Sequence, residues 1–141
     1  MHLPLWSVVT LCTELVVTTL VYFIIYDATL RGVFRRGLAF GVLAYEALFN
    51  ISYMTSRLLK GTHDGTAQIM TPYETGLAIF HGTFSFLMFI ALVVFFIVAA
   101  RAYARGDHYF RTHPRTTILF VSAWGISILS GVLFFFELYL L

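Results

Sequence analysis

The sequence contains few cysteine, proline and charged residues, and each of these shortages excludes a class of protein or of site. Cys12 is its one cysteine, which excludes an intrachain disulfide and a cysteine-rich metal site. Only 3 of the 141 residues are proline, and no proline-, glycine- or serine-rich linker divides the chain. With 11% charged and 60% hydrophobic residues, the composition is not that of an ordinary soluble domain.

Sequence signatures of common enzymes are missing as well. There is no phosphate-binding loop, no dinucleotide fingerprint, no zinc-protease motif and no Glu-x-x-His pair of the kind found in di-iron bundles. The formal net charge is +2, and no basic run could follow a nucleic-acid backbone. We therefore expect a non-enzymatic protein that has no nucleic-acid partner.

Long apolar stretches are what the sequence does contain. Each has about the 20 mostly apolar residues that a helix needs to cross a bilayer. The four stretches are residues 5–26, 37–59, 73–100 and 117–141. The sequence therefore predicts an all-α integral membrane protein, with a single domain over residues 1–141 and four transmembrane helices in an antiparallel bundle surrounded by the lipid bilayer.

The basic residues predict the orientation of this bundle. Seven of the nine lie at the first and third connections, at about residues 27–36 and 101–116: Arg31, Arg35, Arg36, Arg101, Arg105, Arg111 and Arg115. Because basic connections stay on the cytoplasmic side, we expect both of these loops to be cytoplasmic and both termini to lie on the outer side. We predict a multi-pass protein of a prokaryotic cell (inner) membrane.

Helix-start signals precede the last two apolar stretches. Thr71 is followed by Pro72 and, three residues on, by Glu74, which is the order of a capping box with proline at the first helical position. Pro114 likewise offers a start for the last helix, because the missing N–H of proline costs nothing in the first turn. We expect helices to begin at both places.

Polar residues within the apolar stretches are the candidates for function. Glu46, Asn50, Tyr53 and Arg57 are spaced by four, three and four residues, so they share one face of the second predicted helix. Glu14 lies inside the first predicted helix, and we expect it at a depth in the membrane similar to that of Glu46. Charged side chains are costly inside a bilayer, so these carboxyl groups should face the bundle and be paired or protonated. They are candidates for a proton relay, a quinol contact or a metal site, or else for hydrogen bonds between helices.

His81 is the one histidine inside an apolar stretch, and His113 opens the last helix. The imidazole of His81 could ligate haem iron or copper, and Tyr53, Arg57 and Glu137 are expected at a similar depth. The alternative is a hydrogen-bonded packing residue. The default expectation is that no cofactor is bound.

Small residues recur at four-residue intervals in the last stretch, at Ala123, Ser127 and Gly131. Such a seam lets helices approach closely. The spacing predicts either contacts inside the bundle or docking to another membrane subunit.

Four short motifs resemble the CtaM/YozB-like family of small four-span membrane proteins. They are residues 34–38 (Phe-Arg-Arg-Gly-Leu), 47–53 (Ala-Leu-Phe-Asn-Ile-Ser-Tyr), 79–81 (Ile-Phe-His) and 113–116 (His-Pro-Arg-Thr), with Trp124 and Gly131. The resemblance implies that the chain takes part in the maturation of haem-copper oxidases or acts as an accessory protein. It also implies histidines on several helices; His81 and His113 match them, whereas Phe34 and Arg57 stand where two others are expected.

Three functions remain open from the sequence. The leading prediction is a membrane assembly factor or accessory subunit that binds other integral membrane subunits of a respiratory redox complex. The second is a haem-, copper- or quinone-binding module that uses His81 with Tyr53, Glu46, Glu14 or His113. The third is a proton-conducting element around Glu14 and Glu46.

Overall fold

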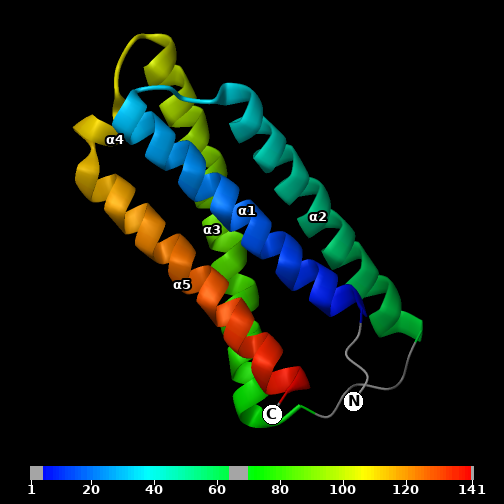
Figure 1. Ribbon diagram of the computed structural model, residues 1–141. Helices are drawn as coiled ribbons and strands as arrows, with labels where there is room; N and C mark the ends of the chain where they lie inside the picture. Colours follow the sequence, from blue (N-terminus) through cyan, green and yellow to red (C-terminus); the bar gives the residue numbers. More distant parts are fainter. Residues whose placement is uncertain (1–4, 64–69, 141) are drawn as a thin grey trace.

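The computed structural model describes residues 5–63 and 70–140, and these residues are almost entirely helical. The helices in this part of the chain are α1 (Leu5–Arg31), α2 (Arg36–His63), α3 (Pro72–Ala104), α4 (Tyr109–Thr112) and α5 (Pro114–Tyr139). The four long helices run alternately in opposite directions and form one bundle (Figure 1). The prediction of an all-α protein is confirmed.

The long helices are arranged as a ring of four. α1 packs against α2 and α5, and α3 packs against the same two helices, with the most extensive contact between α3 and α5. α1 and α3 therefore lie diagonally across the bundle from each other. The short helix α4 touches α1, α3 and α5 and covers one end of the bundle (Figure 1).

Three of the long helices are suited to crossing a membrane by their length and composition. They are Ser7–Arg31 within α1, Pro72–Ala104 and Pro114–Tyr139. The chain is therefore a multi-pass membrane protein whose apolar helices fit a lipid bilayer. α2 is of similar length, but no equally apolar stretch occurs among its described residues.

The first arginine-rich connection is shorter than predicted. Residues 27–36 were expected to form a loop, but α1 continues to Arg31 and only residues 32–35 link it to α2. The apolar stretch of the sequence ends at residue 26, whereas the backbone hydrogen bonds of α1 continue to Arg31. Gly32 then turns the chain with a φ of +71°, a left-handed conformation that glycine adopts without steric cost.

The predicted loop at residues 101–116 is also largely helical. α3 extends to Ala104, the unpredicted one-turn helix α4 follows, and α5 begins at Pro114. Four residues are too few for a periodic sequence signal, and α4 is held by contacts with α1, α3 and α5.

Both predicted helix starts are confirmed. The Thr71 hydroxyl accepts a hydrogen bond from the Glu74 amide at 3.2 Å, and the Glu74 carboxylate accepts one from the Thr71 amide at 2.6 Å. This is a complete capping box, with Pro72 in the first turn. Pro114 similarly occupies the first turn of α5.

The buried core lies in the half of the bundle nearest the α1–α2 connection. It contains Val17, Val21, Ile24, Ile25, Ala28, Ala39, Val42, Leu43, Met88, Leu92, Phe95, Phe96, Ala99, Phe110, Phe120 and Trp124. At its centre the ring of Phe95 lies 4.4 Å from that of Phe120 and 5.2 Å from that of Phe110. The buried polar residues Glu46, Ser127 and Ser130 lie further towards the other end of the bundle, whereas Asp27 lies at the same end as this core.

Candidate functional site

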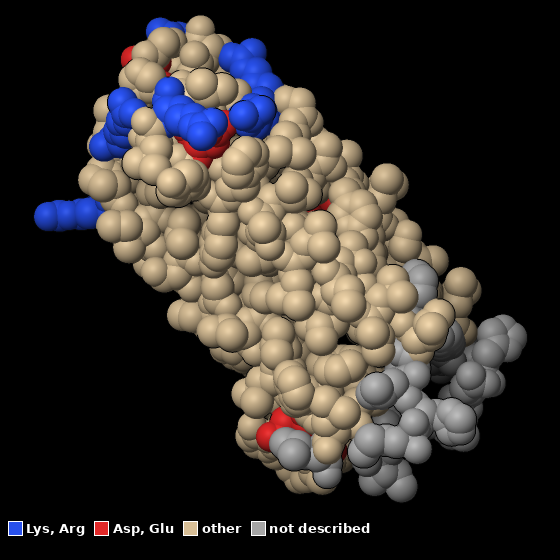
Figure 2. All heavy atoms as spheres, viewed as in Figure 1, with Lys and Arg blue, Asp and Glu red and all other residues tan. Residues whose placement is uncertain are grey.

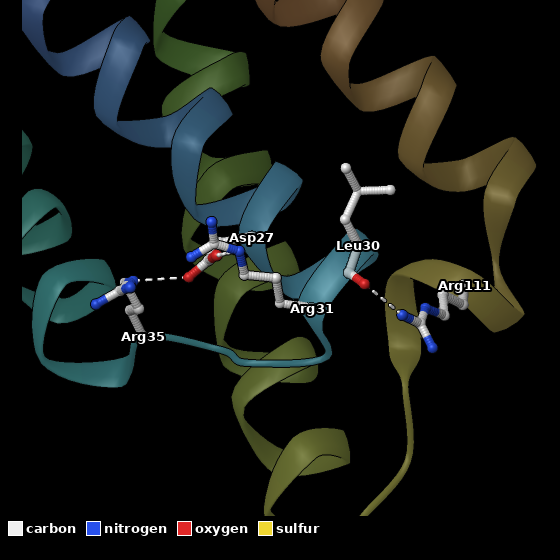
Figure 3. A network of polar contacts seen from close by, with 5 residues as sticks. All are labelled: Asp27, Leu30, Arg31, Arg35 and Arg111. Atoms are coloured by element: carbon white, nitrogen blue, oxygen red, sulfur yellow. Dashed lines mark hydrogen bonds and ion pairs between the residues drawn. The ribbon is translucent and has the colours of Figure 1, made fainter.

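Basic side chains gather at one end of the bundle, which we call the arginine end (Figure 2). It comprises Arg31, Arg35, Arg36, Arg101, Arg105, Arg111 and Arg115. Asp27 is buried there and is only 1% exposed. The Nε atom of Arg35 donates to its Oδ2 at 2.7 Å, and the Nε atom of Arg31 lies 3.4 Å from its Oδ1 (Figure 3).

Asp27 was not among the residues singled out from the sequence. Its position four residues before Arg31 was the available signal, because side chains at that spacing share one side of a helix. Its pairing with Arg35 crosses the turn at Gly32, and only the structure reveals it.

Side chains from α3 and α4 bind the last carbonyl groups of α1. Carbonyls at the end of a helix lack the usual intrahelical partners, although that of Ala28 still accepts from the Gly32 amide at 3.1 Å. Arg111 donates from Nε to the carbonyl of Thr29 and from its NH2 group to that of Leu30, while the Tyr103 hydroxyl donates to that of Ala28 (Figure 3 shows the Leu30 contact). The arginine end is therefore a fixed junction of three helices.

His81 lies in a polar cluster between α3 and α5. Its Nδ1 atom is 2.9 Å from the Ser130 hydroxyl and 3.2 Å from that of Ser85, and the Ser85 and Ser127 hydroxyls are 3.0 Å apart. Ser130 donates its proton to the Ser127 carbonyl at 2.6 Å. The Ser130 oxygen must therefore accept from His81, which places the imidazole proton on Nδ1 and leaves a lone pair on Nε2.

Gly131 makes room for the His81 ring. A Cβ atom at this position would lie 2.7 Å from Cε1 and 3.2 Å from Nε2 of the imidazole. Ser127 is buried against Ser85, and Ala123 packs against the core. The predicted small-residue seam of α5 thus makes contacts inside the bundle, which answers the question that the sequence left open.

Glu46 is a buried carboxyl group on α2. It is 3% exposed; its Oε2 accepts a hydrogen bond from Asn50 at 3.3 Å, and its Oε1 is buried without a partner in the described part of the chain. Glu14 of α1 is close enough to interact electrostatically with it. The predicted inward orientation of this α2 face therefore holds for Glu46.

The remaining predicted residues lie elsewhere. The ring of Tyr53 stacks on that of Phe49 at 6.5 Å. His113 stacks on Tyr109 at 4.5 Å, and its Nδ1 lies 2.9 Å from the Thr112 hydroxyl. The side chain of Arg57 lies outside the described residues.

Phe34 occupies the position where the family resemblance implies a histidine. Its ring lies 5.5 Å from that of Tyr103, 6.0 Å from Phe96 and 6.2 Å from Phe110. An aromatic cluster thus fills this part of the arginine end.

The candidate residues are therefore distributed over separate places. His81 belongs to the α3–α5 contact, Glu14 and Glu46 to the α1–α2 contact and His113 to the arginine end, and Tyr53 stacks on Phe49 of α2. Within residues 5–63 and 70–140, no three His, Cys, Asp or Glu side chains come together as metal ligands would. The chain matches no family model, no curated protein and no solved structure.

Proposed function

We propose that this chain is a non-enzymatic accessory subunit or assembly factor that packs through α2 against another integral membrane subunit. One observation carries the proposal: α2 directs a row of mostly small side chains away from the bundle. This row, the α2 outer face, comprises Gly37, Gly41, Ala44, Leu48, Ser52 and Thr55, all of them exposed. Spacings of three and four residues place them on one side of the helix.

Large apolar side chains are exposed on every long helix, such as Phe80 of α3, Leu129 of α5 and, beside this row, Ile51 of α2, and they suit contact with lipid tails. In contrast, Gly37 and Gly41 have open space where a side chain would be, and their G-x-x-x-G spacing lets a second helix approach closely. Ser52 could hydrogen-bond to such a helix. These features favour a neighbouring helix over lipid.

Two polar side chains of the bundle, those of His81 and Asp27, bind partners within the chain, which also favours a structural role. His81 bonds to serines of α3 and α5, and Asp27 pairs with arginines. The proposal that the partner belongs to a respiratory redox complex rests on the family resemblance given above.

We further propose that all four long helices span the membrane. α2 is as long as α1 and lies in the same bundle, so its polar middle would be covered by α1, α3 and the partner helix. The arginine end would then face the cytoplasm, and both termini would lie on the outer side.

Cysteine labelling tests this topology. In a Cys12→Ser background, Thr71→Cys should react with a membrane-impermeant maleimide in intact cells, because residue 71 is exposed at the end opposite the arginine end. Asp107→Cys, exposed at the arginine end, should react only after the cells are permeabilised. The reverse pattern would invert the topology, and labelling of both in intact cells would exclude an odd number of spans between them.

Gly41→Leu tests the docking surface. The new side chain would keep a partner helix at a distance, so we expect co-purification of the partner from native membranes in mild detergent to fall by about tenfold, which corresponds to about 1.4 kcal/mol of lost packing. Quantitative mass spectrometry of the subunits recovered with the tagged chain measures it.

Gly82→Leu is the matched control. Gly82 is also an exposed helical glycine with open space around it, but it lies on α3. The Gly82→Leu variant should recover the same subunits in the same amounts as the unchanged chain. Equal losses in both variants, or recovery of only a second copy of this chain, would contradict the proposal.

A further inference from the structure

The inward face of α2 contains a buried carboxyl group whose hydrogen bonding is incomplete. Glu46 is 3% exposed, and its Oε1 has no partner in the described part of the chain. The only side chain shown to bond its other oxygen is Asn50, at 3.3 Å. The same Asn50 nitrogen donates at 2.7 Å to the Glu46 carbonyl, so its shorter bond goes to the backbone.

These contacts favour a neutral carboxylic acid over a carboxylate. A charged side chain inside a membrane helix is costly, and an oxygen without a partner recovers none of that cost. The ion pairs of the described residues join arginines to Asp27 and Asp107, at the arginine end. In the acid form, Oε1 is a hydroxyl that can donate a proton.

A second carboxyl group, that of Glu14, lies on α1, which packs against α2, and it is near enough to Glu46 for their charges to interact. α3 also packs against α2, but its histidine within the membrane, His81, is bound to Ser85 and Ser130. Two neighbouring carboxyl groups in an apolar setting do not both ionise at low cost, so one of them retains a proton.

We propose that Glu46 and Glu14 form a proton-binding site between α1 and α2. Glu46 carries the proton on Oε1 and Glu14 is the neighbouring carboxylate, so the pair holds one proton and one negative charge. The site lies on the side of α2 opposite the α2 outer face. It does not depend on the proposed docking role.

An apolar carbodiimide tests the site, because it reacts with protonated carboxyl groups inside a bilayer. The full chain in lipid vesicles at neutral pH is treated with dicyclohexylcarbodiimide, and the modified residue is identified by peptide mass spectrometry. We expect modification at Glu46 and its complete loss in Glu46→Gln. Glu74→Gln is the control, because Glu74 caps α3 at the bundle end, and it should leave the labelling at Glu46 unchanged.

Infrared spectroscopy supplies an independent readout. The C=O band of a protonated carboxyl group should be present in the wild-type chain at neutral pH and should be lost in Glu46→Gln, with helix content unchanged by circular dichroism. In Glu14→Gln the band should persist and titrate differently with pH. An unreactive Glu46 without this band would overturn the proposal, as would loss of both signals when sodium ions are added, which would identify a metal-cation site.

Discussion

Arg35→Ala should lower the free energy of unfolding by about 2–3 kcal/mol. Breaking a fully buried ion pair costs about 3–5 kcal/mol, and the value expected here is smaller because the Arg35 side chain is 46% exposed. Asp27 would remain buried, with only the more distant Arg31 to pair with it. Unfolding in mixed micelles with increasing denaturing detergent, followed by circular dichroism, measures the change.

A double variant identifies the buried charge as the cause. Adding Asp27→Asn to Arg35→Ala removes that charge, so the double variant should be more stable than Arg35→Ala alone. Arg105→Ala is the control, because Arg105 and Asp107 form an exposed pair whose loss should cost less than about 1 kcal/mol. Additive losses in the double variant would refute the role assigned to the ion pair.

Gly131→Ala should destabilise the protein by about 1–3 kcal/mol, the usual cost of inserting an extra carbon into a packed interior. Its Cβ would lie 2.7 Å from Cε1 of His81, and the bond between Nδ1 and Ser130 restrains the ring from moving away. The same unfolding assay measures it.

Gly76→Ala is the matched control for this second prediction. Gly76 is also a helical glycine, but a Cβ there meets open space, so alanine should be neutral or stabilising by up to about 1 kcal/mol. Adding His81→Ala to Gly131→Ala should recover part of the loss, because it removes the ring that the methyl group strikes. Wild-type stability in Gly131→Ala would show that the two side chains are not in this contact.

Local sequence signals predicted the helical framework well. The capping box at Thr71 and the proline at 114 act through neighbouring backbone atoms, so each could be recognised without knowledge of the fold. The burial of Glu46 followed from the same local reasoning, because a carboxyl group inside an apolar stretch is costly towards lipid.

Features that depend on how helices are placed in space were not predictable in the same way. The partner of Asp27 across the turn and the binding of α1 carbonyls by Arg111 require knowledge of which helix ends meet. Periodicity also could not show that the small residues of α5 face α3, whereas those beginning at Gly37 face outward. Small residues are compatible with either placement, and the distinction comes from the neighbours of each helix.

The contact between Arg111 and the end of α1 has a consequence for biosynthesis. Arg111 follows the carbonyl of Thr29 by 82 residues in the chain. At about 5–20 residues per second, a ribosome needs about 4–16 s to add those residues after α1 has been made. During that interval the last carbonyls of α1 must be satisfied by water or lipid headgroups. The end of α1 is therefore completed only after Tyr103 of α3 and Arg111 of α4 have been synthesised.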